Sequence, residues 1–218
     1  LDNSQQAVAA LQRAQELPEA DFWSDSILAE VIALRADPYW FGQQAQTLLE
    51  QGKIVEHLRV LDRLVQETPD DATSAVRLAR GLLYARDLAT AARVLDDTLQ
   101  RNPGAVEPTF LRAVVHYNAR EIPQAIELLN AAIRAKPDYV EAHYQLAACL
   151  RQSGGAPQVV RELQTVLRLE PAFNSARIDL AEVLLESGDK SAAKVHLDAA
   201  LKLEPANERI PKLLKQRH

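Results

Sequence analysis

The chain has 218 residues, enough for one or two compact domains or for one elongated array of repeats. Hydrophobic residues make up 47% of it and aromatic residues only 5%, a profile that favours helices and argues against a sheet-rich protein. The formal net charge of −5 disfavours general nucleic-acid binding, which needs clustered lysine and arginine. No apolar run approaches the roughly 20 residues that cross a bilayer.

The opening residues have a helical pattern. Residues 5–17 carry one apolar stripe that matches the second helix of the later units: Ala7, Leu11 and Ala14. Because Pro18 ends this pattern, residues 1–17 are predicted to be the second helix of a truncated preceding repeat. The chain opens at Leu1 and contains no methionine, so we expect a soluble segment of a longer protein of bacterial type. The sequence leaves its compartment open between cytoplasm and periplasm.

A segment without the repeat follows at residues 18–37. Its second half has a helical apolar pattern, so we predict a loop and an adapter helix. The aromatic residues on either side have two interpretations, of which we favour the first. They pack inside the chain where the adapter helix meets the first regular unit, or they form an exposed patch for self-association or for docking another domain. These residues are Phe22, Trp23, Tyr39, Trp40 and Phe41.

Five regular units make up most of the chain. Proline returns every 34 residues, at Pro69, Pro103, Pro137, Pro171 and Pro205. Each unit is predicted to hold two helices joined by a short turn and closed by this proline, which lacks the N–H that a helix needs. The predicted units are residues 38–71, 72–105, 106–139, 140–173 and 174–207. Residues 208–218 are predicted to form a C-terminal capping helix that covers the exposed apolar end.

Two columns of the aligned units indicate how the helices pack. The first helix carries a small residue at one fixed position: Ala45, Ala79, Ala113, Ala147 and Ala181. The second helix carries leucine at one fixed position: Leu61, Leu95, Leu129, Leu163 and Leu197. Small residues let two helix backbones approach, and large residues fill the grooves between them. The pattern therefore predicts an all-α array of packed helix pairs.

A 34-residue helix–turn–helix unit with these columns and a closing proline resembles the tetratricopeptide repeat. The likeness covers residues 38–205 without a gap. The aromatic residues favoured in the family's first helix are mostly replaced, by Ala75, Thr109, His143 and Arg177. The resemblance implies a right-handed superhelical solenoid of antiparallel helix pairs, whose first helices line a concave groove. It also implies a scaffold that binds a protein or peptide and catalyses no reaction.

Alignment with the family predicts which side chains face this groove. They are Arg77, Arg80, Tyr84, Phe110, Val114, Tyr117, Asn118, Tyr144 and Arg151. Aromatic and arginine side chains dominate binding hot spots, so we expect an extended or helical peptide with apolar and acidic side chains. The alternative is that the aromatic rings only fill space between helices. The Lys–Asn set with which some family members clamp a C-terminal carboxylate is absent at the matching positions.

Other chemistry finds little support in the sequence. It has no Gly-rich phosphate loop and no nucleophile elbow, so no catalytic residue and no cofactor is predicted. The five histidines have no metal-ligand spacing, so no metal site is predicted. Cys149 is expected to be a small buried hydrophobic residue. Arg112 and His116 stand in usually apolar columns, and we favour a local rotation of the helix over a polar site that titrates near neutral pH.

The sequence therefore predicts a non-catalytic protein–protein interaction scaffold that binds a partner segment in its groove. The alternative is a structural spacer or an oligomerisation module of a longer protein, with no ligand in the groove. Neither nucleic acid nor membrane insertion is expected.

Overall fold

The structure is a computed structural model that describes residues 45–48 and 50–215. The predicted adapter helix lies outside these residues, as do the aromatic residues for which we weighed internal packing against a self-association patch: Phe22, Trp23, Tyr39, Trp40 and Phe41. The described residues form helices and turns only, which confirms the predicted all-α class. The chain divides into two compact parts, one that ends at Leu111 and one that begins at Arg112, and each is described by itself.

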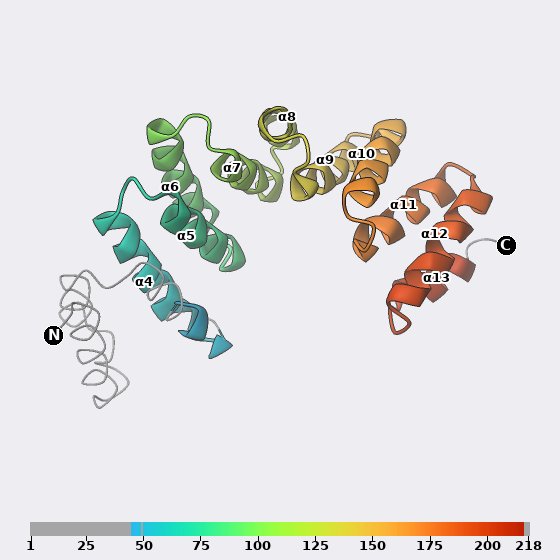
Figure 1. Cartoon of the computed structure of the whole chain (residues 1–218), viewed down its shortest axis with the longest axis horizontal. Coiled ribbons are helices and arrows are strands. Elements are labelled where there is room, and N and C mark those ends of the chain that lie inside the picture. Colours follow the sequence, from blue (N-terminus) through green and yellow to red (C-terminus); the bar gives the residue numbers. More distant parts are fainter. Residues whose placement is uncertain (1–44, 49, 216–218) are drawn as a thin grey trace. The chain divides into compact units, whose positions relative to one another are not determined.

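Among its described residues, the part that ends at Leu111 contains three complete helices and the first half of a fourth. They are α4 (Ile54–Glu67), α5 (Ala72–Tyr84), α6 (Leu88–Arg101) and α7 (Val106–Asn118). Residues 45–48, ahead of α4, are helical as well. Helix α5 packs against both α4 and α6, so neighbours in sequence are neighbours in space (Figure 1).

The part that begins at Arg112 continues the alternation. Its further helices are α8 (Ile122–Ala135), α9 (Val140–Gln152), α10 (Ala156–Leu169), α11 (Asn174–Glu186), α12 (Lys190–Leu203) and α13 (Arg209–Lys215). Each of these helices packs against the next one in the chain. The last helix, α13, packs against both α12 and α11.

The helix starts keep the period of the sequence. Helices α5, α7, α9 and α11 begin at Ala72, Val106, Val140 and Asn174, which are the first residues of four predicted units. The second helix of each pair ends two residues before one of the periodic prolines. The division of the whole chain at 1–17, 18–37, 38–207 and 208–218 stays a prediction, because part of it lies outside the described residues.

The turns inside the helix pairs share one backbone geometry. After α5, the N–H of Asp87 donates to the carbonyl of Leu82 at 2.9 Å and the N–H of Arg86 donates to that of Leu83 at 3.1 Å. This Schellman motif needs a left-handed residue between the helices. That residue recurs every 34 positions, and its φ lies between 64° and 86°: Gly52, Arg86, Arg120, Gly154 and Gly188.

Aspartates at the following position begin two of the second helices, α6 and α12. The carboxylate of Asp87 accepts from the N–H of Thr90 at 3.1 Å, and that of Asp189 accepts from the N–H of Ala192 at 3.0 Å. These bonds satisfy N–H groups that the first turn of a helix leaves free. The carboxylate of Asp71 caps the first helix α5 in the same way, through the N–H groups of Thr73 and Ser74.

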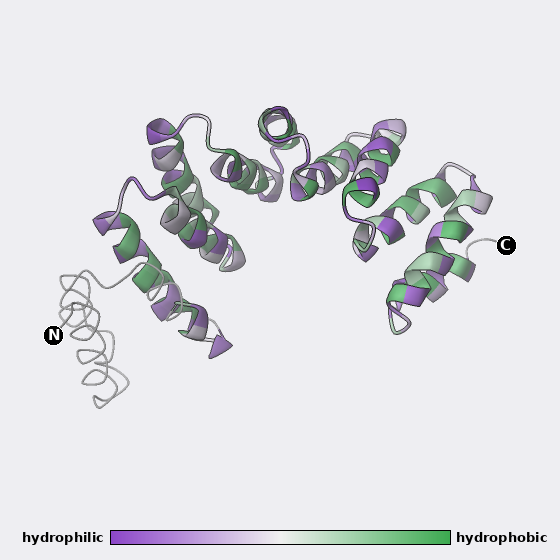
Figure 2. Ribbon diagram, in the orientation of Figure 1, coloured by the Kyte–Doolittle hydropathy of each residue, from purple (hydrophilic) through white to green (hydrophobic). Residues whose placement is uncertain are grey.

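The two predicted packing columns form the core. Every alanine of the first column and every leucine of the second is at most 2% exposed. Figure 2 shows hydrophobic residues alternating with hydrophilic ones along the helices. The last helix takes part, because Ile210 and Leu213 of α13 pack into the cluster around Leu197. Thus α13 covers the apolar side of α11 and α12 with its own apolar face.

Candidate functional site

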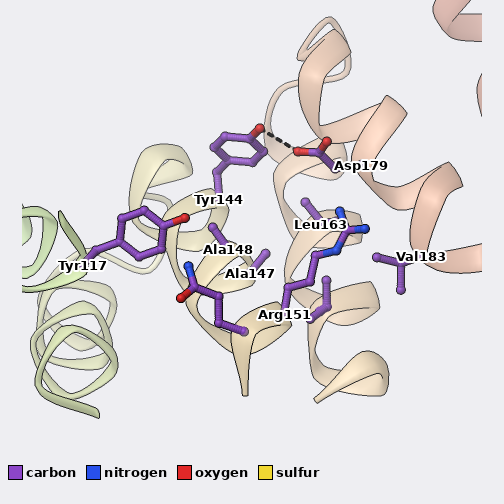
Figure 3. A pocket seen from close by; sticks show the side chains of 10 residues that line it. Tyr117, Tyr144, Ala147, Ala148, Arg151, Leu163, Asp179 and Val183 are labelled. Atoms are coloured by element: carbon purple, nitrogen blue, oxygen red, sulfur yellow. Dashed lines mark hydrogen bonds between the residues drawn. The ribbon is translucent and has the colours of Figure 1, made fainter. Parts of the chain in front are cut away.

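The part that begins at Arg112 contains a pocket with a volume of about 450 Å³. Helices α9, α10 and α11 provide nearly all of its wall. The lining residues are Tyr117, Tyr144, Ala147, Ala148, Arg151, Gln152, Val159, Leu163, Asp179 and Val183. Four of them, Ala147, Val159, Leu163 and Val183, are core residues, each 2% exposed, and form an apolar floor. Figure 3 shows two tyrosines at one side and Arg151 reaching toward Leu163 and Val183.

The pocket has a local cause in the sequence. Ala148 of α9 stands in a column where the other first helices carry larger side chains: Arg80, Val114 and Glu182. Since alanine ends at Cβ, α9 leaves open the space that a longer side chain would occupy in this column. Ala147, one residue earlier, belongs to the small column that lets helices approach. The adjacent small residues Ala147 and Ala148 therefore leave room for the pocket between α9 and the core.

Tyr144 is fixed at the rim by two contacts. Its hydroxyl donates to Oδ2 of Asp179 on α11 at 2.7 Å, and its ring centroid lies 4.9 Å from that of Phe173. Burial and then the bond to Asp179 raise the pKa of Tyr144 above its ordinary value of 10.0. The hydroxyl is therefore a neutral donor that joins α9 to α11.

Arg151 bridges the same two helices. Its Nη1 donates to Oε2 of Glu182 at 2.7 Å, and its Nη2 donates to Oε1 of Glu186 at 2.6 Å. The bond to Glu182 is the main cause that raises the pKa of Arg151. The guanidinium thus uses its fork on two carboxylates of its own chain.

The C-terminal helix adds a second cation to this cluster. Nη2 of Arg209, the first residue of α13, donates to Oδ1 of Asp179 at 2.8 Å and to Oε2 of Glu182 at 3.2 Å. Burial lowers the pKa of Arg209, but the bond to Asp179 and the neighbouring carboxylates raise it by more. The charged groups Arg151, Asp179, Glu182, Glu186 and Arg209, hereafter the rim network, connect α9, α11 and α13.

Three of the predicted groove residues line this pocket: Tyr117, Tyr144 and Arg151. Of the others beyond Leu111, Val114 is half-buried on α7, and Asn118 donates its side-chain N–H to the carbonyl of Val114 at 2.8 Å. Arg151 is already paired with Glu182 and Glu186 of its own chain, and the predicted preference for acidic side chains in the partner stays a prediction.

The remaining predicted residues belong to the part that ends at Leu111. Arg77 is exposed on α5, and Tyr84 at the end of the same helix is 70% exposed. Arg80 pairs with Glu107, with 2.6 Å between Nη2 and Oε1. Phe110 differs from the prediction because it is only 7% exposed, so it packs in the core and offers a partner little surface.

The sequence did not assign the floor residues of the pocket or Arg209 to a binding site, although it placed Ala147 and Leu163 in the packing columns. The floor comes partly from the second helix α10, whereas alignment with the family points to first helices only. The signal that would have found the pocket is the Ala147–Ala148 pair in α9.

The sequence also gives expectations for Arg112, His116 and Cys149. The core of α7 takes Leu111 and Val115, which agrees with a local rotation and leaves Arg112 and His116 half-buried. His116 Nδ1 lies 2.5 Å from Oε2 of Glu121 at the adjoining turn. Cys149 is fully buried, and burial raises the pKa of its thiol to about 11, so it is a core residue as expected.

The same residues bear on two other kinds of site. Over 45–48 and 50–215, no three histidine, cysteine or acidic side chains gather closely enough to hold a metal ion. None of the helices in that part of the chain combines the length and hydropathy that a bilayer-spanning segment requires.

The comparisons with known proteins agree with the fold. Residues 76–140 and 110–157 match the sequence model of the tetratricopeptide repeat family. No curated protein matches the chain. The chain is similar to the solved structure of TTC0263, a thermophilic TPR protein of Thermus thermophilus. Their TM-score is 0.66 and their identity 21%, over 80% of this chain and 95% of the other.

Two further solved structures are similar. MamA of Desulfovibrio magneticus RS-1 gives a TM-score of 0.64 and 19% identity, over 78% of this chain and 96% of that one. YrrB is described as a TPR protein with an unusual peptide-binding site. It gives a TM-score of 0.61 and 16% identity, over 82% of this chain and 92% of that one. At these identities the likeness concerns the fold.

Residues 76–157 are similar to tetratricopeptide repeats, and the fold class is an all-α helical repeat solenoid. Proteins with this fold are typically non-catalytic, and the fold indicates a protein–protein interaction scaffold.

Proposed function

We propose that the chain is an interaction scaffold whose pocket on α9, α10 and α11 receives an apolar side chain of a partner segment. The observation that carries this proposal is the pocket itself, about 450 Å³ with an apolar floor and a polar rim. Pockets of this size and character are common binding sites in proteins. The description of YrrB, which names a peptide-binding site on the same fold, supports a peptide as the ligand.

The character of the pocket favours an apolar anchor. Its floor consists of aliphatic side chains, while the tyrosine hydroxyl and the arginine at the rim already have partners within the chain. An apolar side chain in the pocket removes its own surface and that of the floor from water. A buried anchor of this kind contributes about 2 kcal/mol to binding, or roughly 30-fold in affinity.

A selection from a random peptide library on the full chain tests the proposal. The selected peptides are then titrated against Ala148→Trp, which fills the pocket, and Gln164→Trp, which places an indole on an exposed position of α10. We expect Ala148→Trp to weaken binding by at least about 30-fold and Gln164→Trp to leave it unchanged. Ala148→Val, which restores the residue found at Val114, weakens it by a smaller factor.

Helical circular dichroism and thermal unfolding of each variant check that the fold is retained. The proposal is wrong if the library yields no binder, as expected for a spacer with an idle pocket. It is equally wrong if the selected peptides bind a folded Ala148→Trp chain as tightly as the unchanged one.

A further inference from the structure

The charges around the pocket indicate more about the partner, provided that the proposed function holds. Three carboxylates of α11 lie on one side of this helix, three and four residues apart: Asp179, Glu182 and Glu186. Asp179 lines the pocket, and the other two bind Arg151, which lines it as well. Whatever enters the pocket therefore meets the rim network.

The rim network has more negative than positive charge. Two guanidinium groups, those of Arg151 and Arg209, face the three carboxylates. The other polar residues of the pocket lining, Tyr117 and Gln152, are neutral. The network thus retains one unbalanced negative charge at the mouth of a pocket with an apolar, poorly polarisable floor.

The rim network also has carboxylate oxygens that can accept further hydrogen bonds. Oε1 of Glu186 accepts from Arg151, and none of the described residues donates to its Oε2. Oε2 of Glu182 accepts from both arginines, and in the same part of the chain its Oε1 has no donor either. The side chain of Glu186 is 58% exposed, so a partner can reach it.

A cation and an anion therefore meet different conditions here. An ammonium or guanidinium group can donate to the free oxygens without displacing any existing bond. A carboxylate of the partner meets an Arg151 that is already paired with Glu182 and Glu186, at 2.7 and 2.6 Å, and approaches against a net negative charge. Charge complementarity thus selects against an acidic segment.

We infer that the partner is a peptide segment with an apolar anchor next to a lysine or arginine. The anchor occupies the pocket above Leu163 and Val183, and the cation binds the free carboxylate oxygens of Glu182 and Glu186. Here the arginines are not ligand contacts; they hold the acidic side chains of α11 in place.

The peptides selected on the full chain test this inference. We expect lysine or arginine to be enriched within a few positions of the apolar anchor, and aspartate and glutamate to be depleted. Glu186→Gln, which keeps the acceptor for Arg151 but removes the charge, is expected to weaken binding about threefold to tenfold. Glu127→Gln removes the same charge from an exposed position of α8 and is expected to change nothing. The loss on Glu186→Gln shrinks at high salt, because salt screens exposed charges.

Each outcome bears on a different claim. Some selected peptides lose binding on Ala148→Trp and so support the proposed function. If these peptides carry acidic or uncharged flanks, or if they bind the Glu186→Gln chain as tightly as the unchanged one, the inference is wrong and the proposed function stands. Peptides that bind Ala148→Trp normally overturn the proposed function itself.

Discussion

Two of the turns carry arginine in a backbone conformation that suits glycine. Arg86 and Arg120 have φ of 64° and 66°, at the position where other turns have Gly154 and Gly188. An L-residue there costs about 1–2 kcal/mol through contact of Cβ with the backbone. Glycine avoids this cost but loses about 0.5–1 kcal/mol more conformational entropy on folding. We therefore expect Arg120→Gly to stabilise the chain by about 0.5–1 kcal/mol.

Replacing glycine by a residue with a Cβ at the same turn position is expected to lower the stability. A Cβ added at Gly188 meets no atom within 4 Å, so Gly188→Ala tests the backbone cost alone and is expected to destabilise by about 0.5–1 kcal/mol. Gly104 is a matched control, because its added Cβ also meets nothing within 4 Å and its φ lies outside the left-handed region. Arg120→Ala is the control for the arginine side chain, since it keeps the left-handed cost.

Urea unfolding of the full chain, followed by helical circular dichroism, measures these differences. Because repeat arrays can unfold in parts, hydrogen exchange of the amides around each turn locates the change. Strain in the turn is refuted if Arg120→Gly is less stable than Arg120→Ala, or if Gly188→Ala costs no more than Gly104→Ala.

Three other side chains give further predictions. Hydrogen bonds from Ser74 and Thr73 outweigh burial and lower the pKa of Asp71 below 3.8. Its stabilisation is therefore present above this value and lost as the pH falls below it, so the stability difference between wild type and Asp71→Ala should vanish in acid urea titrations. Tyr144→Phe keeps the ring but removes the hydrogen bond to Asp179, and is expected to lower the stability by about 0.5–1.5 kcal/mol. In an alkaline titration followed by tyrosinate absorbance, this variant should show one fewer group that titrates well above pH 10. An unchanged alkaline titration counts against the buried hydroxyl. Glu162→Ala removes the carboxylate 2.7 Å from Nδ1 of buried His143 and should cost about 1–3 kcal/mol in urea unfolding, whereas a neutral result means that the imidazole finds another partner.

Much of the fold follows from the 34-residue register. The alanine and leucine columns decide which faces are buried, because a helix pair of this size can hide its apolar face only against neighbouring pairs. The left-handed residues of the turns were harder to predict from the sequence. Glycine marks a left-handed residue at Gly154 and Gly188, but arginine gives no such signal at Arg86 or Arg120, where the Schellman hydrogen bonds enforce the conformation.

The site was predictable only in part. Tyr144 and Arg151 were identified from the sequence, and both lie at the pocket, although their role in binding a partner stays a prediction. The pairing of Arg151 with Glu182 and Glu186 was not predicted, because long side chains from different helices meet according to packing rather than spacing. Arg209 lies beyond the regular units, so no column of the repeat pointed to it. Phe110 was predicted to face the groove because alignment with the family gives only its column, whereas its side chain packs in the core.

The central claim is that a partner places an apolar side chain in the pocket of α9, α10 and α11. Intermolecular NOEs between a selected peptide and the methyl groups of the chain test it most directly. We predict NOEs from one apolar peptide side chain to Ala148, Leu163 and Val183. NOEs confined to the exposed methyl groups of Val55 or Val195, which are 59% and 66% exposed, would contradict the account.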